Sequence, residues 1–109
     1  MYVENSQAHF HYNGFGDQSS LGPFAVSPGE HRITLEYESL GNRSGQGRLL
    51  MDDAEQIGWT NLSPTLTFGI FEGLDVGIDR RGPVLWELYE RHGAFAYSGT
   101  VRDVKVVPL

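Results

Sequence analysis

The sequence contains no cysteine, which excludes a disulfide framework, a thiolate zinc cluster and a thiol nucleophile. It also lacks the roughly 20 consecutive apolar residues that a membrane-spanning helix needs. The first twenty residues have neither the basic start nor the apolar run of a secretory signal. We therefore expect a soluble protein without membrane contact; its compartment is unknown, with the cytoplasm as the default.

Basic residues are scarce as well. Eight Lys and Arg stand against fourteen Asp and Glu, giving a formal net charge of −6 that disfavours binding to the phosphate backbone of nucleic acids. No cofactor or catalytic motif occurs, so we expect neither a cofactor nor an enzyme. The 109 residues fit a single domain spanning 1–109, which would bury about two thirds of its unfolded surface.

Glycine, by contrast, is abundant. Fourteen glycines are roughly twice average usage, and together with plentiful aromatic and β-branched residues they favour short strands joined by tight turns. The clearest alternation follows Ser27-Pro28-Gly29, where Ile33, Leu35 and Tyr37 point one way. A glycine-rich loop follows at 41–47, and the acidic turn Asp52-Asp53-Ala54 predicts a hairpin between the strands on either side of it. A short helix is expected after Pro83. The predicted strands are 7–12, 31–38, 47–51, 57–61, 65–70, 74–79, 95–97 and 100–107.

Several short motifs occur in a fixed order along the chain. They are Tyr12-Asn13-Gly14, Gly29-Glu30-His31, Asp75-Val76-Gly77-Ile78-Asp79, and the ending Phe95, Gly99, Val101 and Val104. In this order they resemble the C-terminal β-sandwich domain of bacterial arylsulfatases, which is similar to laminin-G and concanavalin-type domains. The resemblance implies an all-β fold, an antiparallel β-sandwich of jelly-roll type with one short helix.

The sulfatase chemistry does not follow from this resemblance. The family's Cys/Ser-x-Pro-x-Arg motif is missing, because neither Ser27-Pro28 nor Ser63-Pro64 lies in that frame. The family domain also carries another strand or two ahead of the segment that begins here at Tyr2. Missing strands would leave sheet edges unpaired, so we predict a homodimer or higher oligomer formed through open edges.

The alternating residues predict a core between two sheets. Its expected members are Phe10, Tyr12, Ile33, Leu35, Tyr37, Leu66, Phe68, Val76, Ile78, Phe95 and Val101.

Histidine and acidic pairs provide two candidate metal sites. His9 and His11 share one strand face about 7 Å apart, which suits one zinc or copper ion if further ligands converge; we favour two solvent-facing imidazoles. Asp75 and Asp79 share a face that could hold calcium. For Asp79 we favour a turn cap ahead of Arg80.

Two tryptophans are the best candidates for exposed ligand-binding aromatics. Trp59 lies in a polar segment and Trp86 lies opposite the apolar stripe of the predicted helix, although core filling is the simpler role for such residues. We therefore expect a non-catalytic β-sandwich module that binds carbohydrate or a partner protein, or associates with itself. The alternative is a small-molecule-binding protein or unrecognised enzyme with a pocket near His9 and His11.

Overall fold

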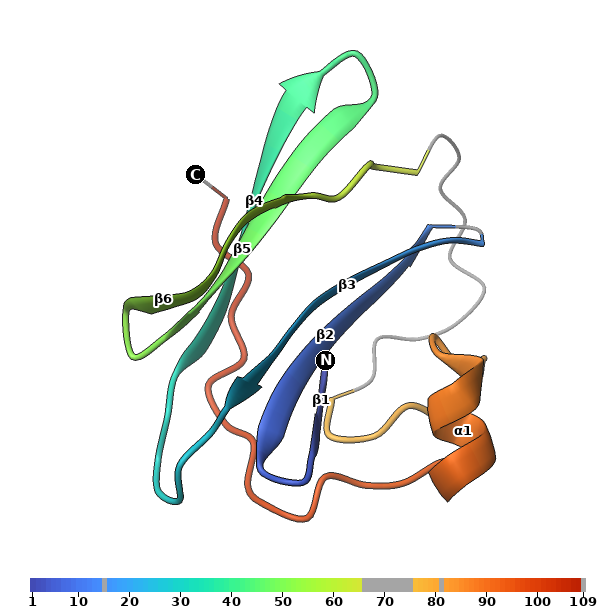
Figure 1. The fold of residues 1–109 in the computed structure, drawn as a ribbon. Helices are drawn as coiled ribbons and strands as arrows, with labels where there is room; N and C mark the ends of the chain where they lie inside the picture. The colour runs from blue at the N-terminus through green and yellow to red at the C-terminus, as the bar shows by residue number, and fades with distance from the viewer. Residues whose placement is uncertain (15, 66–75, 81, 109) are drawn as a thin grey trace. The chain divides into compact units, whose positions relative to one another are not determined.

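The computed structural model describes residues 1–14, 16–65, 76–80 and 82–108. The chain divides into two compact units, 1–69 and 70–109. All named strands belong to the first unit and the helix belongs to the second (Figure 1). The mostly β content and the one short helix are confirmed, while the jelly-roll type and the single domain stay predictions. The elements are β1 (Tyr2–Glu4), β2 (Gln7–Gly14), β3 (Asp17–Ala25), β4 (Ile33–Gly41), β5 (Ser44–Met51), β6 (Ala54–Asn61) and α1 (Trp86–His92).

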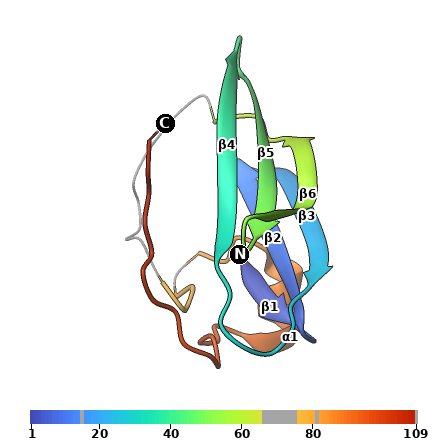
Figure 2. The same cartoon turned by 90° about the vertical axis from the view of Figure 1, so that its left-hand side faces the viewer.

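The strands form two antiparallel three-stranded sheets, which lie apart in Figure 1; in Figure 2 the β4–β6 sheet is in front of the β1–β3 sheet. In the first, β2 lies between β1 and β3; in the second, β5 lies between β4 and β6. Three hairpins turn through two residues that both have positive φ, at Asn5-Ser6, Asn42-Arg43 and Asp52-Asp53. Such turns match the right-handed twist of paired strands, and Asn and Asp tolerate this backbone well.

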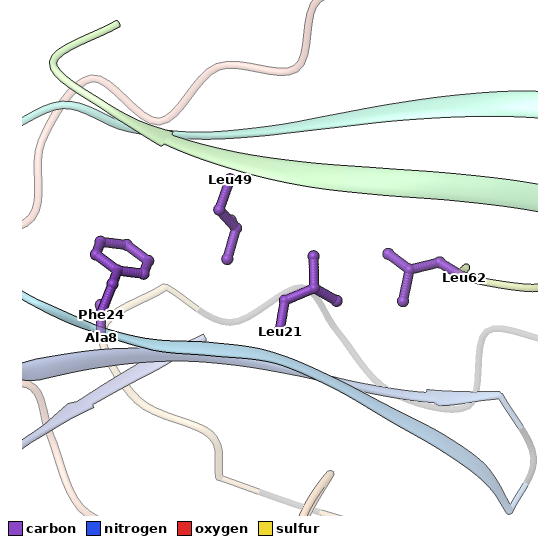
Figure 3. Packing of buried hydrophobic residues seen from close by; sticks show 5 residues of the cluster. All are labelled: Ala8, Leu21, Phe24, Leu49 and Leu62. Atoms are coloured by element: carbon purple, nitrogen blue, oxygen red, sulfur yellow. The ribbon is translucent and has the colours of Figure 1, made fainter. Parts of the chain in front are cut away.

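The buried core lies between the two sheets. Leu49 of β5 is fully buried and points toward Leu21 and Phe24 of β3, with Leu62 beside them (Figure 3). Ala8 of β2 completes the cluster. Because each sheet hides its apolar face against the other, these contacts hold the layers together.

Strand β3 was not predicted, because its sequence does not alternate. Leu21 and Phe24 are three residues apart and would point to opposite faces of a regular strand. An irregularity in the β2–β3 ladder lets both face the core. Gly22 allows it, since its φ is 99° and a Cβ there would lie 3.0 Å from the carbonyl oxygen of Ala8.

The predicted glycine-rich loop after β4 is wrong, because β5 begins at Ser44. Gly45 and Gly47 are buried inside this strand. A Cβ on Gly45 would meet the ring of Tyr37, and one on Gly47 would meet a methyl group of Leu62. Glycine is therefore used here for close packing within a strand rather than for a turn.

The predicted core is correct in part. Phe10, Tyr12 and Ile33 pack against the buried cluster. Leu35 and Tyr37 lie opposite Leu49 and Gly47, on the side of the sheet predicted to face inward. They are nevertheless 41% and 45% exposed, because β4 is an edge strand.

Other residues predicted to lie in the core are further from that prediction. Val76 and Val101 are 53% and 46% exposed, and both belong to the second unit, outside the two sheets. Ile78 and Phe95 are half-buried. Leu66 and Phe68 lie outside the described residues.

The second unit contains less regular structure than predicted. Its described residues hold α1 and one isolated bridge between Ile78 and Ala96, supported by the N–H of Tyr97, which donates to the carbonyl of Gly77 at 2.6 Å. The predicted strand over 100–107 is wrong, since 100–108 has no ladder partner among the described residues. No helix in the described part of the chain is long and apolar enough to cross a bilayer.

Truncation at the centre of the core should be far more costly than truncation at the surface. Leu49→Ala removes a fully buried side chain and should lower the free energy of unfolding by about 2–5 kcal/mol. Leu40→Ala, at a side chain that is 53% exposed, should change it by about 0.5 kcal/mol or less. Urea denaturation of both variants tests this, and equal effects would contradict the packing between the sheets.

Candidate functional site

The outer face of the β4–β6 sheet, opposite the core, carries a continuous group of polar and aromatic side chains. It combines one exposed indole, one guanidinium, one amide and three carboxylates. We call it the Trp59 face, made of Glu36, Glu38, Gln46, Arg48, Glu55 and Trp59.

Irregular pairing in β6 places the tryptophan on this face. Glu55, Ile57 and Trp59 are two residues apart, so a regular strand would put all three on one side. The β5–β6 ladder shifts register at two places. As a result Ile57 packs against the core, whereas Glu55 and Trp59 contact Arg48 on the outer face.

Arg48 connects all three strands of the sheet. Its Nε lies 2.6 Å from a carboxylate oxygen of Glu36 on β4, and its Nη1 lies 3.2 Å from Glu55 on β6. The guanidinium also lies 4.8 Å from the ring centroid of Trp59, a cation–π contact. The hydrogen bond to Glu36, more than the one to Glu55, raises the pKa of Arg48, so its charge is permanent.

The arrangement offers an immobilised aromatic surface surrounded by hydrogen-bonding groups. The Trp59 side of the sheet is accessible, since the residue is 43% exposed. Gln46, two residues before Arg48 on β5, donates a hydrogen bond to Glu38 on β4 at 2.7 Å. This bond holds both side chains in place beside Arg48. An indole with fixed polar groups beside it is the usual means of binding a ligand that has both apolar and hydroxyl-bearing surfaces.

A second polar cluster lies where β4 begins. The Nδ1 of His31 is 2.6 Å from Oδ2 of Asp52, in the β5–β6 turn, and its Nε2 is 2.8 Å from the carbonyl oxygen of Ser27 and 3.1 Å from Oγ of the same serine. The other carboxylate oxygen of Asp52 accepts the N–H of Arg32 at 2.9 Å. The His31 side chain is only 16% exposed.

This cluster has the order of a Ser-His-Asp triad but is better explained as a clamp on the loop. In a triad the Nε2 atom must accept the hydroxyl proton. Here Nε2 faces the Ser27 carbonyl, which can only accept, so Nε2 carries the proton and donates it. The cluster thus fixes the 26–32 segment against the β5–β6 turn.

The two histidines of β2 do not converge on a shared centre. The ring of His9 stacks on Tyr2 at 4.6 Å between centroids. The ring nitrogens of His11 lie 2.7 Å from Ser20 Oγ and 3.1 Å from Gln18 Oε1. The described residues contain no group of three or more His, Asp or Glu side chains that could hold a metal ion.

Of the candidate calcium pair Asp75 and Asp79, the structure describes only Asp79. The Oδ2 atom of Asp79 accepts the backbone N–H of Val84 at 3.4 Å, which is the turn-capping role favoured from the sequence. Asp75 lies outside the described residues.

Trp86 is exposed like Trp59 but has different surroundings. It is 56% exposed at the start of α1, and its ring stacks on Tyr89 at 5.4 Å. Its indole N–H donates to Glu90 one turn later at 2.8 Å. Among the described residues, its polar partner Glu90 lies one helical turn away rather than on a neighbouring strand, so this part of the chain gives Trp86 no platform like the Trp59 face.

The sequence indicated both tryptophans but missed the residues that organise the sites. Arg48 lies just after the predicted loop 41–47, at the start of the predicted strand 47–51. No feature of the neighbouring sequence predicts that it pairs with Glu36. Asp52 was recognised as part of a turn, but its partner His31 lies 21 residues earlier. The signal that could have predicted the His31–Asp52 contact is the two-residue turn at Asn42-Arg43. This turn sets the register of β4 and β5, and so places the start of β4 beside the end of β5.

No family model, curated protein or solved structure matches the chain. The resemblance to the sulfatase accessory domain therefore stays a prediction. Function is inferred from the chain's own side chains.

The His31–Asp52 pair should make stability depend on pH. The Asp52 carboxylate and then the Ser27 carbonyl raise the pKa of His31 above its ordinary value of 6.5. The N–H of Arg32 and then His31 lower the pKa of Asp52 below 3.8. The His31 contribution is lost as the pH rises through its raised pKa, and the Asp52 contribution is lost as the pH falls through its lowered pKa.

Wild type should therefore exceed His31→Gln in unfolding free energy most strongly near pH 5, with a smaller difference in strongly acidic and in alkaline buffer. Urea denaturation across this range measures the difference. In an Asp52→Asn background the His31→Gln effect should vary much less with pH. The same variation in both backgrounds would contradict the ion pair.

Proposed function

We propose that this chain is a non-catalytic β-sheet module that binds carbohydrate on the Trp59 face. The observation that carries the proposal is an exposed indole whose ring is backed by Arg48, which is itself fixed by two carboxylates. Sugar rings present a face of C–H groups that stacks on an indole, and their hydroxyl groups bond to neighbouring polar side chains.

The fixed geometry favours binding because little freedom remains to be lost. Arg48 is only 30% exposed and contacts both flanking strands, so the indole above it is restrained before a ligand arrives. Since Arg48 lies over one ring face, the sugar would stack on the other. Restraint of this kind reduces the entropy lost on binding.

The charges of this face favour a neutral sugar. Three carboxylates, those of Glu36, Glu38 and Glu55, accompany the single guanidinium of Arg48, which already pairs with two of them. An anionic glycan would meet unbalanced negative charge, whereas hydroxyl groups can donate to the same oxygens. We therefore expect neutral oligosaccharides to bind and sulfated or uronic-acid polysaccharides to bind poorly.

The test is a glycan array followed by titration calorimetry of any neutral oligosaccharide that binds. Trp59→Ala should weaken binding by at least about tenfold, because stacking on tryptophan supplies much of the contact energy. Trp86→Ala is the matched control: it removes an exposed tryptophan of the second unit and should leave affinity unchanged.

Two results would overturn the proposal. One is the absence of binding to any neutral glycan by protein that melts cooperatively. The other is binding that survives Trp59→Ala and is lost with Trp86→Ala, which would move the site to the second unit.

A further inference from the structure

The outer edge of β4 differs from the other sheet edges. Strand β1 has three residues, β3 is interrupted at Gly22–Pro23, and the β5–β6 ladder is irregular at two places. Strand β4 pairs in unbroken register with β5 from Ile33 to Ser39 and has no partner on its other side among the described residues. Irregular or short edges resist pairing with another chain, whereas a long regular edge invites it.

The backbone groups that point outward can be identified from the bonds at the start of the strand. The N–H of Asp52 donates to the carbonyl of Arg32 at 2.8 Å, and the N–H of Arg32 donates to the Asp52 side chain at 2.9 Å. The backbone of Arg32 thus faces β5. Because this direction alternates along a strand, Ile33, Leu35 and Tyr37 present their N–H and C=O groups at the open edge.

The strand is self-complementary in one antiparallel register. With Leu35 opposite its own copy, Ile33 lies opposite Tyr37, so apolar residues meet on the core side. On the outer side, Arg32 lies opposite Glu38. The exposed guanidinium of Arg32 and the exposed carboxylate of Glu38 would then pair twice, once on each side of the two-fold axis.

Neighbouring registers are less favourable. Centring the pair on Tyr37 places Glu36 opposite Glu38, and centring it on Glu36 places that residue opposite its own copy. Like charges directly opposite destabilise paired strands. Centring on Thr34 would direct Arg32 at Glu36, whose negative charge is already paired with the Arg48 guanidinium at 2.6 Å, whereas Glu38 bonds to the neutral amide of Gln46.

We propose that two copies of this chain pair antiparallel through β4, with Leu35 on the two-fold axis and Arg32 of each copy bonded to Glu38 of the other. The outward N–H and C=O groups of Ile33, Leu35 and Tyr37 form the ladder. Pairing covers part of Leu35 and Tyr37, which are 41% and 45% exposed. The proposal is independent of sugar binding.

Sedimentation velocity over a concentration series tests the pairing by charge exchange. Glu38→Arg and Arg32→Glu should each raise the dimer dissociation constant by about tenfold or more, because each creates two repelling contacts. The double variant Arg32→Glu/Glu38→Arg restores opposite charges and should recover most of the affinity. Asp17→Arg makes the same charge change as Glu38→Arg on the other sheet and should leave the constant unchanged.

Amide exchange followed by NMR supplies a readout at the edge itself. The amides of Leu35 and Tyr37 should gain protection as concentration rises in wild type and should not in Glu38→Arg. Three results would overturn the proposal: a monomer at all concentrations, a dimer unaffected by either single reversal, or edge amides protected in the monomer, which would mean that the chain covers its own edge.

Discussion

The packing of Leu49 against Leu21 and Phe24 is the contact on which the rest of the first unit depends. Each three-stranded sheet has one apolar side that must be buried, and each hides this side against the other. Among the described residues the buried cluster has five members, Ala8, Leu21, Phe24, Leu49 and Leu62. Since these face inward, the opposite side of the β4–β6 sheet is free to carry charged and aromatic residues that do not contribute to the core.

Ladder irregularities assign side chains to the two sides of the sheets. In β3 the irregularity brings Leu21 and Phe24 to the same side, and in β6 one irregularity on each side of Ile57 separates it from Glu55 and from Trp59. Without them an indole would compete with the core for space, or a leucine would face water. The bulges that make β3 and β6 poor edges for pairing are thus the same features that build the core and expose Trp59.

Local patterns in the sequence predict the parts of this fold that are regular. The alternation after Pro28 predicts β4, and the acidic turn at Asp52-Asp53 predicts the β5–β6 hairpin. Pro83 predicts the start of α1. Patterns fail where a glycine serves packing, as at Gly45, and where a bulge breaks the period, as in β3. The exposure of Leu35 could not be predicted from alternation either. Alternation shows which side of the sheet a side chain points to, but not whether the other sheet reaches far enough to cover it.

The two proposed uses of the β4–β6 sheet share Glu38 but are centred on different strands. Trp59 lies on β6, the copy-pairing edge is β4, and β5 lies between them. Arg48 on β5 bonds to Glu36 on β4 and to Glu55 on β6, so it connects side chains on all three strands of the outer face. Pairing through β4 about an axis perpendicular to the sheet keeps both outer faces on one side. A polymeric ligand could then contact both Trp59 residues, and linked sites of this kind bind a repeating ligand more tightly than either site alone.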